Sequence, residues 1–370
     1  MRSLDKNLLI VSLFFIGLGL VQIYSSSYIF ATEKYGNSLH FFNRQLVFSF
    51  LGIAVMFFCA LSPFQYFRRF GYVLAIGAAI GVGLTYVPGL GVKVGGAQRW
   101  IQILPSLRVE PSEFLKVTLP FWVAALFFKT WHPKIKYAAI AASVITLFAL
   151  FKQPDFGNLV ICVTITLLLL FSFGLKWIYI LSSMAVAIPG ACILILIEPY
   201  RYARLMSFID PWADPAKKGF QVIQSMVSYN AGGLAGQGLG LGQGKLFFLP
   251  EAHTDFTLSV LGEEMGFLGV ALVLILFAYI FYKGLQISIK CPQPDVRCIS
   301  LGLTFLFAIS VFINAGMTMG LLPPKGLTLP FLSYGGSSLI CQCFLVGILL
   351  NIDRSQKLKK ISQKYTGLRV

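Results

Sequence analysis

Long apolar runs separated by short polar stretches dominate the pattern of this chain. A membrane-spanning helix needs about 20 consecutive, mostly apolar residues. Runs of roughly that length are found at 8–29, 45–61, 71–88, 113–129, 137–152, 157–175, 177–196, 258–282, 298–320 and 336–351. The pattern therefore predicts an all-α polytopic integral membrane protein with about ten transmembrane helices.

Three segments depart from this pattern of helices and short loops. Residues 197–257 form one long extracytoplasmic loop between the seventh and eighth predicted helices, and loops of that length usually have a function. Inside it, residues 219–227 have apolar positions at helical spacing, which predicts a helix lying in the membrane interface. The glycine-rich run 232–245 predicts a tightly turning loop whose backbone can approach a bulky ligand. Residues 321–338 contain three prolines and three glycines, which predicts a re-entrant segment forming part of a cavity wall.

Composition and charge support a membrane protein and indicate its orientation. With 57% hydrophobic residues, 12% charged residues and a mean hydropathy of +0.78, a soluble domain with a wetted surface is excluded. If the N-terminus is cytoplasmic, most Lys and Arg fall on the cytoplasmic face and nearly all remaining acids on the other. The net charge of +16 therefore indicates topology and contact with anionic lipid, not nucleic acid. We expect a multi-pass membrane protein with both termini cytoplasmic, in which 1–351 form a single membrane domain and 352–370 a solvated basic cytoplasmic tail.

Several other chemistries lack their sequence patterns. The seven cysteines show neither a disulfide framework nor metal-ligand spacing. The glycine run that ends at Gly244-Lys245 resembles a phosphate-binding loop only superficially. Leu239 stands where a Walker motif needs glycine, and Leu246 stands where Ser or Thr would bind magnesium. We therefore expect no nucleotide site.

The first candidate for catalysis is Asp255. It belongs to the charged, proline-marked segment 249–256, which precedes an apolar run long enough to cross a membrane. We therefore expect Asp255 to lie where a water-exposed loop meets the bilayer. Partial desolvation at such a boundary can tune the proton affinity of a carboxylate, as a general base requires.

Two further polar groups are expected on the same side of the membrane. Ser112 is expected to cap the fourth helix, and Glu113 and Lys116, three residues apart, share one face of it. Such a pair either holds helices together or forms a polar site between them, and the sequence leaves both readings open. Asp155, in the connection between the fifth and sixth helices, belongs either to a polar site or to an ordinary hairpin turn.

Five short strings carry a resemblance that covers nearly the whole chain. They are Gly-Ala-Gln-Arg-Trp at 96–100, Pro-Ser-Glu-Phe-Leu-Lys at 111–116, Gln-Pro-Asp at 153–155, Pro-Glu-Ala-His-Thr-Asp-Phe at 250–256 and Lys-Gly-Leu-Thr-Leu-Pro-Phe-Leu-Ser-Tyr-Gly-Gly-Ser-Ser at 325–338. In this order they resemble the SEDS family (shape, elongation, division and sporulation proteins), which includes RodA and FtsW. The fourth and fifth strings are more similar to FtsW than to RodA. Asn158 and Thr257 stand where the family pattern has Thr and Ile, which does not affect Asp255.

The resemblance implies a peptidoglycan glycosyltransferase. Such an enzyme polymerises lipid II into β-1,4-linked glycan strands at the outer face of the cytoplasmic membrane, by an inverting mechanism, in cell division or elongation. The family's essential loop aspartate falls on Asp255, which would act as the catalytic base. Its polar helix pair falls on Glu113 and Lys116, and Arg44 matches a shorter motif near the cavity.

The implied reaction also needs cations, because the leaving diphosphate concentrates negative charge. Arg99, Lys116, Arg201, Arg204, Lys245 and Lys325 are the candidates. The full set of residues expected to bind substrate is Arg44, Arg99, Glu113, Lys116, Asp155, Arg201, Arg204, Lys245, His253, Lys325 and Ser333. The sequence requires no cofactor, although a divalent cation (Mg²⁺ or Mn²⁺) could share this task.

The partners implied by the resemblance are lipid II, the undecaprenyl-diphosphate-linked glycan, a class B penicillin-binding protein that cross-links the strand, and other divisome or elongasome membrane proteins. Two alternatives stay open. A lipid II flippase or transporter would need polar groups through the whole membrane depth. A non-catalytic divisome scaffold would leave the long loop without an evident purpose.

Overall fold

The computed structural model describes residues 4–94, 97–104, 107–129, 132–153, 155–182, 184–185, 189–190, 202, 205–206, 208–215, 219–242 and 251–366. Most of these residues are helical. The helices are α1 (Lys6–Tyr35), α2 (His40–Leu61), α3 (Phe64–Leu84), α4 (Pro111–Phe128), α5 (Pro133–Lys152), α6 (Phe156–Ser172), the short η1 (Pro211–Ala213), α9 (Phe220–Gly232), α10 (Thr257–Ile289), α11 (Pro294–Thr318) and α12 (Gly336–Thr366).

Eight of the described helices are long and apolar enough to cross a membrane, namely α1–α5 and α10–α12, and α6 is a shorter apolar helix. The all-α polytopic prediction is therefore confirmed. Nine of the ten predicted apolar runs form helices, whereas half of the run 177–196 lies outside the described residues, and its described residues, 177–182, 184–185 and 189–190, are helical.

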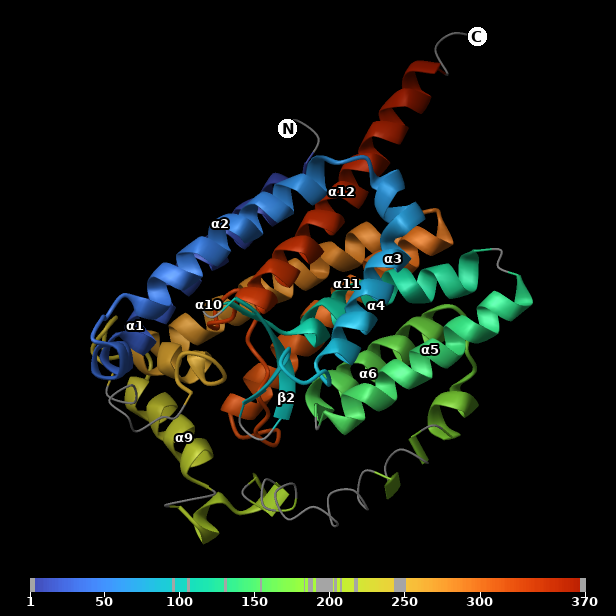
Figure 1. Ribbon diagram of the computed structural model, residues 1–370. Coiled ribbons are helices and arrows are strands. Elements are labelled where there is room, and N and C mark those ends of the chain that lie inside the picture. The colour runs from blue at the N-terminus through green and yellow to red at the C-terminus, as the bar shows by residue number, and fades with distance from the viewer. Residues whose placement is uncertain are drawn as a thin grey trace.

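Both chain termini lie at the same end of the bundle (Figure 1). Because a chain of spanning helices alternates in direction, the connections α1–α2, α3–α4, α5–α6 and α11–α12 all lie at the opposite end, which we call the far end. The far end therefore gathers the residues that the sequence singled out around 97–116, 153–158, 251–256 and 319–338.

The segment between α11 and α12, residues 319–335, has no regular secondary structure and enters the core. Phe331, with a left-handed φ of 65°, lies 6.3 Å from Phe15 of α1 and 6.4 Å from Phe307 of α11 between ring centroids. A Cβ at Gly19 would lie 2.2 Å from the Phe331 carbonyl oxygen, so α1 can approach this closely only at a glycine. The prolines and glycines of the sequence thus correctly predict a segment without regular structure, and its part 329–333 is buried in protein, whereas the predicted cavity wall stays a prediction.

The last described helix, α12, is the most buried of the described spans, with 78% of the residues in its most apolar stretch buried. At the end near the termini it also covers the end of α2. Asn351 Nδ2 donates to the carbonyls of Cys59 and Ser62, and Arg354 donates to that of Leu61 at 2.7 Å. Beyond Asn351 the chain remains helical to Thr366 and projects from the bundle (Figure 1), so most of the predicted tail is a helical extension.

A small sheet in the α3–α4 connection was not predicted. Strands β1 (Gly91–Val94), β2 (Ala97–Leu104) and β3 (Leu107–Val109) form an antiparallel sheet in the order β1-β2-β3. Its last strand leads directly into α4, so the sheet fixes where α4 begins. It also carries Arg99, on β2, to the polar residues at the start of α4.

A break in α10 is closed by the glycine-rich loop. At Gly266 the backbone leaves helical geometry (φ 67°, ψ −168°), which frees the groups that an unbroken helix would pair. The amides of Gln237 and Gly238 donate to the carbonyls of residues 263 and 264, and the amides of residues 267 and 268 donate to the carbonyls of 233 and 234, at 2.9–3.1 Å. The sequence predicts that the backbone of this loop approaches a ligand. In the described part of the loop, the backbone instead approaches α10.

The predicted helix around 219–227 is confirmed as α9. Its apolar residues Val222 and Ile223 are buried, and Ser225 and Tyr229 face α10 and α11. Ser225 Oγ lies 2.6 Å from Ser259 Oγ, and Tyr229 Oη lies 3.0 Å from Thr318 Oγ1. The helix that precedes the glycine-rich loop thus packs on protein.

Candidate active site

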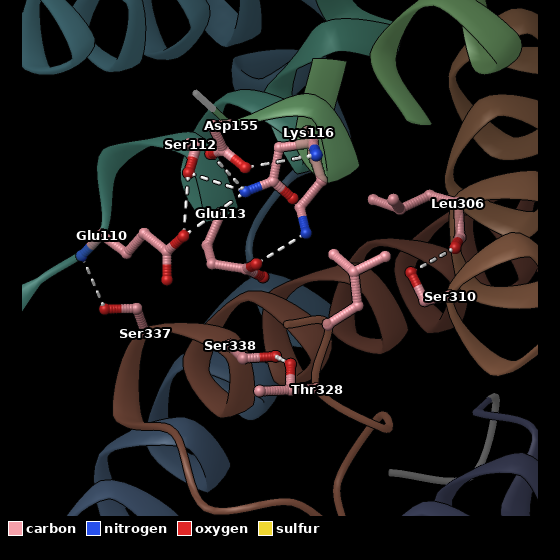
Figure 2. Close-up of polar contacts among 12 residues, drawn as sticks. Glu110, Ser112, Glu113, Lys116, Asp155, Leu306, Ser310, Thr328, Ser337 and Ser338 are labelled. Atoms are coloured by element: carbon pink, nitrogen blue, oxygen red, sulfur yellow. Dashed lines mark hydrogen bonds and ion pairs between the residues drawn. The ribbon is translucent and has the colours of Figure 1, made fainter. Parts of the chain in front are cut away.

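A group of polar side chains lies at the start of α4, which we call the polar cluster: Arg99, Glu110, Ser112, Glu113, Lys116, Asp155 and Asn158. Figure 2 shows Glu110, Ser112, Glu113, Lys116 and Asp155 of this cluster. Its most buried ion pair joins Glu113 Oε1 to Lys116 Nζ at 2.6 Å. Both residues belong to α4, so this ion pair does not itself tie two helices together. The predicted shared face is confirmed.

The predicted cap at Ser112 is wrong. Glu110 occupies the N-cap position with an extended backbone, and Pro111 is the first helical residue. Proline suits that position because its missing N–H is not needed there and its φ is already helical. Ser112 therefore lies inside the first turn, and its hydroxyl donates to Glu110 Oε1 at 3.2 Å.

Asp155 is buried at the start of α6, where it accepts from the backbone amide of Asn158 at 3.4 Å. Arg99 Nη1 reaches its Oδ1 at 3.6 Å. Asn158 Nδ2 donates to Asp155 Oδ2 at 2.8 Å and to Ser112 Oγ at 2.9 Å, so this amide joins α6 to α4. Asp155 is therefore both a turn residue and a member of the polar cluster.

Glu110 is half-buried and lies among like charges. Burial first, and then the charges of Glu113 and Asp155, raise the pKa of Glu110 to about 8. With Glu110 protonated, two carboxylates face two cations, Lys116 and Arg99. The cluster is then close to electrical neutrality at pH 7.

Asp255 lies in a tight turn, residues 251–256, directly before α10. The amides of Thr254, Asp255 and Phe256 all donate to the Glu251 carbonyl at 3.1–3.3 Å. Asp255 is half-buried, and a Cβ at Gly326 would lie 3.4 Å from its Oδ2. The half-buried carboxylate thus lies against the backbone of the 319–335 segment, and its predicted place where the loop meets the bilayer stays a prediction.

His253 is held by aromatic rings. Its ring centroid lies 5.6 Å from that of Phe30, 4.6 Å from Phe41 and 5.9 Å from Tyr334. Burial lowers the pKa of His253, which favours the neutral imidazole. Its carbonyl accepts from the Tyr334 amide at 2.8 Å. Arg44, exposed on α2, hydrogen-bonds the Tyr334 side chain, so it lies on the His253 side of the site.

The 319–335 segment connects the two halves of the site. Near the polar cluster, a Cβ at Gly157 would lie 3.3 Å from a methyl carbon of Leu327. Just after the segment, Ser337 Oγ at the start of α12 accepts from the amide of Glu110 at 3.2 Å. Near Asp255, Lys325 directly precedes Gly326, which faces the carboxylate. Ser333, predicted to bind substrate, is buried, and its hydroxyl accepts from the Leu329 amide at 2.9 Å.

The other predicted cations, Arg201, Arg204 and Lys245, lie outside the described residues. Among the described residues no three His, Cys, Asp or Glu side chains converge as a metal site. These residues therefore do not fit a metal held by the protein alone.

The structure brings four polar residues to the site that the sequence did not predict as site residues: Glu110, Ser112, Asn158 and Asn314. The first three lie within or beside the recognised strings, so their position was the available signal. Asn314 is fully buried four residues before the end of α11. An uncharged amide inside an apolar run is the only trace of it in the sequence.

Comparison with known proteins agrees with this architecture. The family model FTSW_RODA_SPOVE, described as "Cell cycle protein", matches residues 5–358. Two relatives named "Probable peptidoglycan glycosyltransferase FtsW" are similar over nearly their whole length. The one from Geobacter metallireducens is 36% identical (96% of this chain, 97% of the relative), and the one from Trichlorobacter lovleyi is 39% identical (97% and 96%). Stage V sporulation protein E of Bacillus subtilis is 34% identical (95% and 97%).

Two solved structures share the fold. A chain from a study of polymerization and crosslinking by a peptidoglycan synthase complex superposes with a TM-score of 0.76 at 27% identity, covering 96% of this chain and 99% of that one. The rod shape determining protein RodA of Thermus thermophilus gives a TM-score of 0.68 at 24% identity, covering 96% and 98%. Since the family model spans nearly the whole chain and several relatives exceed 30% identity over nearly their full length, this chain belongs to the FtsW/RodA/SpoVE family of cell cycle proteins.

Proposed function

We propose that this chain is a peptidoglycan glycosyltransferase that polymerises lipid II, in cell division or elongation. The FtsW relatives, 36% and 39% identical over nearly full length, carry this activity in their names. The observation that carries the proposal is the Asp255 carboxylate, which faces Gly326 of the 319–335 segment, while the next residue, Leu327, lies against Gly157 beside the polar cluster. In our proposal this end of the bundle faces the extracytoplasmic side and both termini are cytoplasmic.

In the proposed reaction, Asp255 accepts the proton of the 4-hydroxyl of the acceptor GlcNAc as that oxygen attacks the anomeric carbon of the donor MurNAc. The new carbon–oxygen bond forms as the bond to undecaprenyl diphosphate breaks on the opposite face. The anomeric centre is thereby inverted to a β-1,4 linkage. The diphosphate leaves with the electron pair, so cations must lie near it.

Lys325 is the described cation best placed for the diphosphate, because it directly precedes Gly326, which faces the Asp255 carboxylate. Lys116 and Arg99 each have a carboxylate partner in the polar cluster. In our proposal they hold the sugar and peptide groups of lipid II instead of the leaving group. No step of the proposed reaction uses a divalent cation.

We also propose that the chain acts with a class B penicillin-binding protein, which would cross-link the new strand. A similar solved chain, at 27% identity, comes from a peptidoglycan synthase complex that coordinates polymerization and crosslinking. Other membrane proteins of the divisome or elongasome would complete the assembly.

The deciding experiment is conversion of labelled lipid II into glycan polymer by the purified protein with its cognate transpeptidase, in the presence of moenomycin to silence contaminating bifunctional synthases. Asp255→Asn should lower the rate by about 10²-fold to 10⁴-fold, the usual contribution of a general base. Glu33→Gln is the matched control, because Glu33 is an exposed carboxylate at the far end of α1. Substantial polymerisation by Asp255→Asn would remove Asp255 as the base. No polymer from the wild type would favour lipid II transport or scaffolding.

A further inference from the structure

Asn314 is a polar side chain in an unusual place. It lies in α11, a helix apolar enough to span a membrane, and has no exposed surface. A buried amide in such a helix is costly unless its hydrogen-bonding groups are paired. Its partners therefore indicate what the residue does.

Both donors of the amide go to main-chain carbonyls of other segments. Asn314 Nδ2 donates to the carbonyl of Asp255 at 3.0 Å and to the carbonyl of Leu327 at 2.6 Å. Both partners can only accept, which fixes the orientation of the amide, since the flipped form would place Oδ1 against two carbonyl oxygens. One side chain thus joins the 251–256 turn to the 319–335 segment.

The Asp255 carbonyl is available for this contact because α10 does not use it. The amides of Ser259 and Val260 both donate to the Phe256 carbonyl, so the helical pattern of α10 begins one residue after Asp255. Without Asn314, the Asp255 carbonyl would lose the partner described here. Buried carbonyls are rarely left unpaired.

The contact also fixes the carboxylate. Asp255 Oδ2 faces Gly326, the residue before Leu327, so the carboxylate and the second acceptor of Asn314 belong to neighbouring residues of the same segment. The other link between turn and segment, from the Tyr334 amide to the His253 carbonyl, lies two residues away from Asp255. The Asn314 bond therefore holds the backbone of Asp255 itself to α11, in addition to the bond that the Asp255 amide makes within the turn.

Asn314 Oδ1 has no hydrogen-bond partner among the described residues. A buried unsatisfied acceptor costs about 1–3 kcal/mol. An apolar side chain would avoid that cost, so stability alone does not account for an amide at this position. The two donated bonds are the feature that an apolar residue could not supply.

We propose that Asn314 is a positioning residue for Asp255, holding the carboxylate at a fixed place against the 319–335 segment during glycan polymerisation. This inference rests on the proposed function. Since a displacement of about 1 Å can cost 10²-fold in rate, loss of the two bonds should appear mainly in kcat.

Asn351 provides a matched control within the same chain. Its Nδ2 also donates to two main-chain carbonyls, those of Cys59 and Ser62, and it is also buried, but it lies near the end that holds the termini. Asn314→Ala and Asn351→Ala thus remove the same kind of contact at opposite ends of the bundle. Asn314→Leu retains most of the side-chain volume and is apolar, so this variant can be tested in place of Asn314→Ala if Asn314→Ala does not fold.

The experiment measures kcat and KM for lipid II polymerisation and hydrogen–deuterium exchange of residues 251–260. We expect Asn314→Ala or Asn314→Leu to lower kcat at least tenfold with KM within about twofold, and to speed exchange of the turn; Asn351→Ala should do neither. Equal kinetic effects of the Asn314 and Asn351 variants, or an unchanged exchange rate in the turn, would overturn the inference while leaving the proposed function intact. A wild type that makes no polymer would overturn both.

Discussion

The buried pair of Glu113 and Lys116 yields a quantitative prediction about stability. Their side chains are 9% and 6% exposed, and the charged atoms lie 2.6 Å apart. Removing one partner of a buried ion pair leaves an uncompensated charge, which typically costs about 3–5 kcal/mol. Glu113→Gln and Lys116→Met should each destabilise the protein on this scale.

The two single variants should not be equal. In Glu113→Gln, Lys116 keeps the nearby negative charge of Asp155 and has the protonated Glu110 as a second acidic neighbour. In Lys116→Met, Glu113 remains beside those same acids, and Arg99 is the one cation left in the polar cluster. Lys116→Met should therefore cost more.

The double variant removes both charges and should be more stable than either single variant. Replacing a buried pair by uncharged groups of similar volume is often neutral, so we expect Glu113→Gln/Lys116→Met to lie within about 1 kcal/mol of the wild type. With losses of about 3–5 kcal/mol for each single variant, the double-mutant cycle should give a coupling energy of at least about 5 kcal/mol. If the cluster serves the substrate, none of the three variants will recover wild-type polymerisation.

Equilibrium unfolding in mixed micelles, by titration with sodium dodecyl sulfate, measures these differences. The matched control is Lys357→Met, which removes the exposed (i, i+4) partner of Asp353 in α12 and should change stability by less than about 1 kcal/mol. The reasoning is refuted if the double variant is no more stable than the worse single variant, or if Glu113→Gln costs more than Lys116→Met.

Two further predictions concern pH and the break in α10. Because the pKa of Glu110 is raised from 4.5 to about 8 in the folded protein, the proton it keeps stabilises the fold at low pH, and that contribution is lost as pH rises toward 8. Glu110→Gln should therefore gain stability relative to the wild type between pH 5 and pH 8, and parallel unfolding curves across that range would contradict this. Gly236→Ala should destabilise the protein by more than about 2 kcal/mol, because its Cβ would lie 2.2 Å from the Glu264 carbonyl oxygen, whereas Gly240→Ala, with a similar positive φ but open space, should cost only about 1–2 kcal/mol. Equal losses in thermal unfolding would show that contact with α10 is unimportant.

The sequence predicts most of the helical framework, because long apolar runs leave the chain few alternatives in a membrane. It also predicts the shared face of Glu113 and Lys116, which depends only on helical spacing. The start of α4 at Pro111 could have been predicted from the proline itself, whose preference for the first helical position outweighs the capping ability of Ser112.

Features set by contacts distant in sequence could not be predicted. Several glycines interrupt the apolar run of α10, and only the loop that pairs with residues 263–268 determines that the helix breaks at Gly266. The bond from Asn314 to Asp255 joins residues 59 apart. Strands β1–β3 are short and form within a connection, where their alternation is too brief to distinguish them from a loop.

The burial of α12 has a consequence for biosynthesis. Ribosomes make this helix after every other described helix, yet it is the most buried of the described spans and caps α2, which is made long before it. Until α12 is made, the inner face of α2 lacks its final neighbour: a Cβ at Gly52 of α2, for example, would lie 2.8 Å from Cys343 Sγ of α12. Insertion can proceed helix by helix, but the closing contact spans about 290 residues of sequence.

A nascent chain is therefore exposed to membrane proteases and to non-native helix pairing until α12 is made. A premature stop codon shortly before α12 would release a chain that has every other described helix but lacks the most buried one. Quality control at the membrane, more than activity, would determine the fate of such a product.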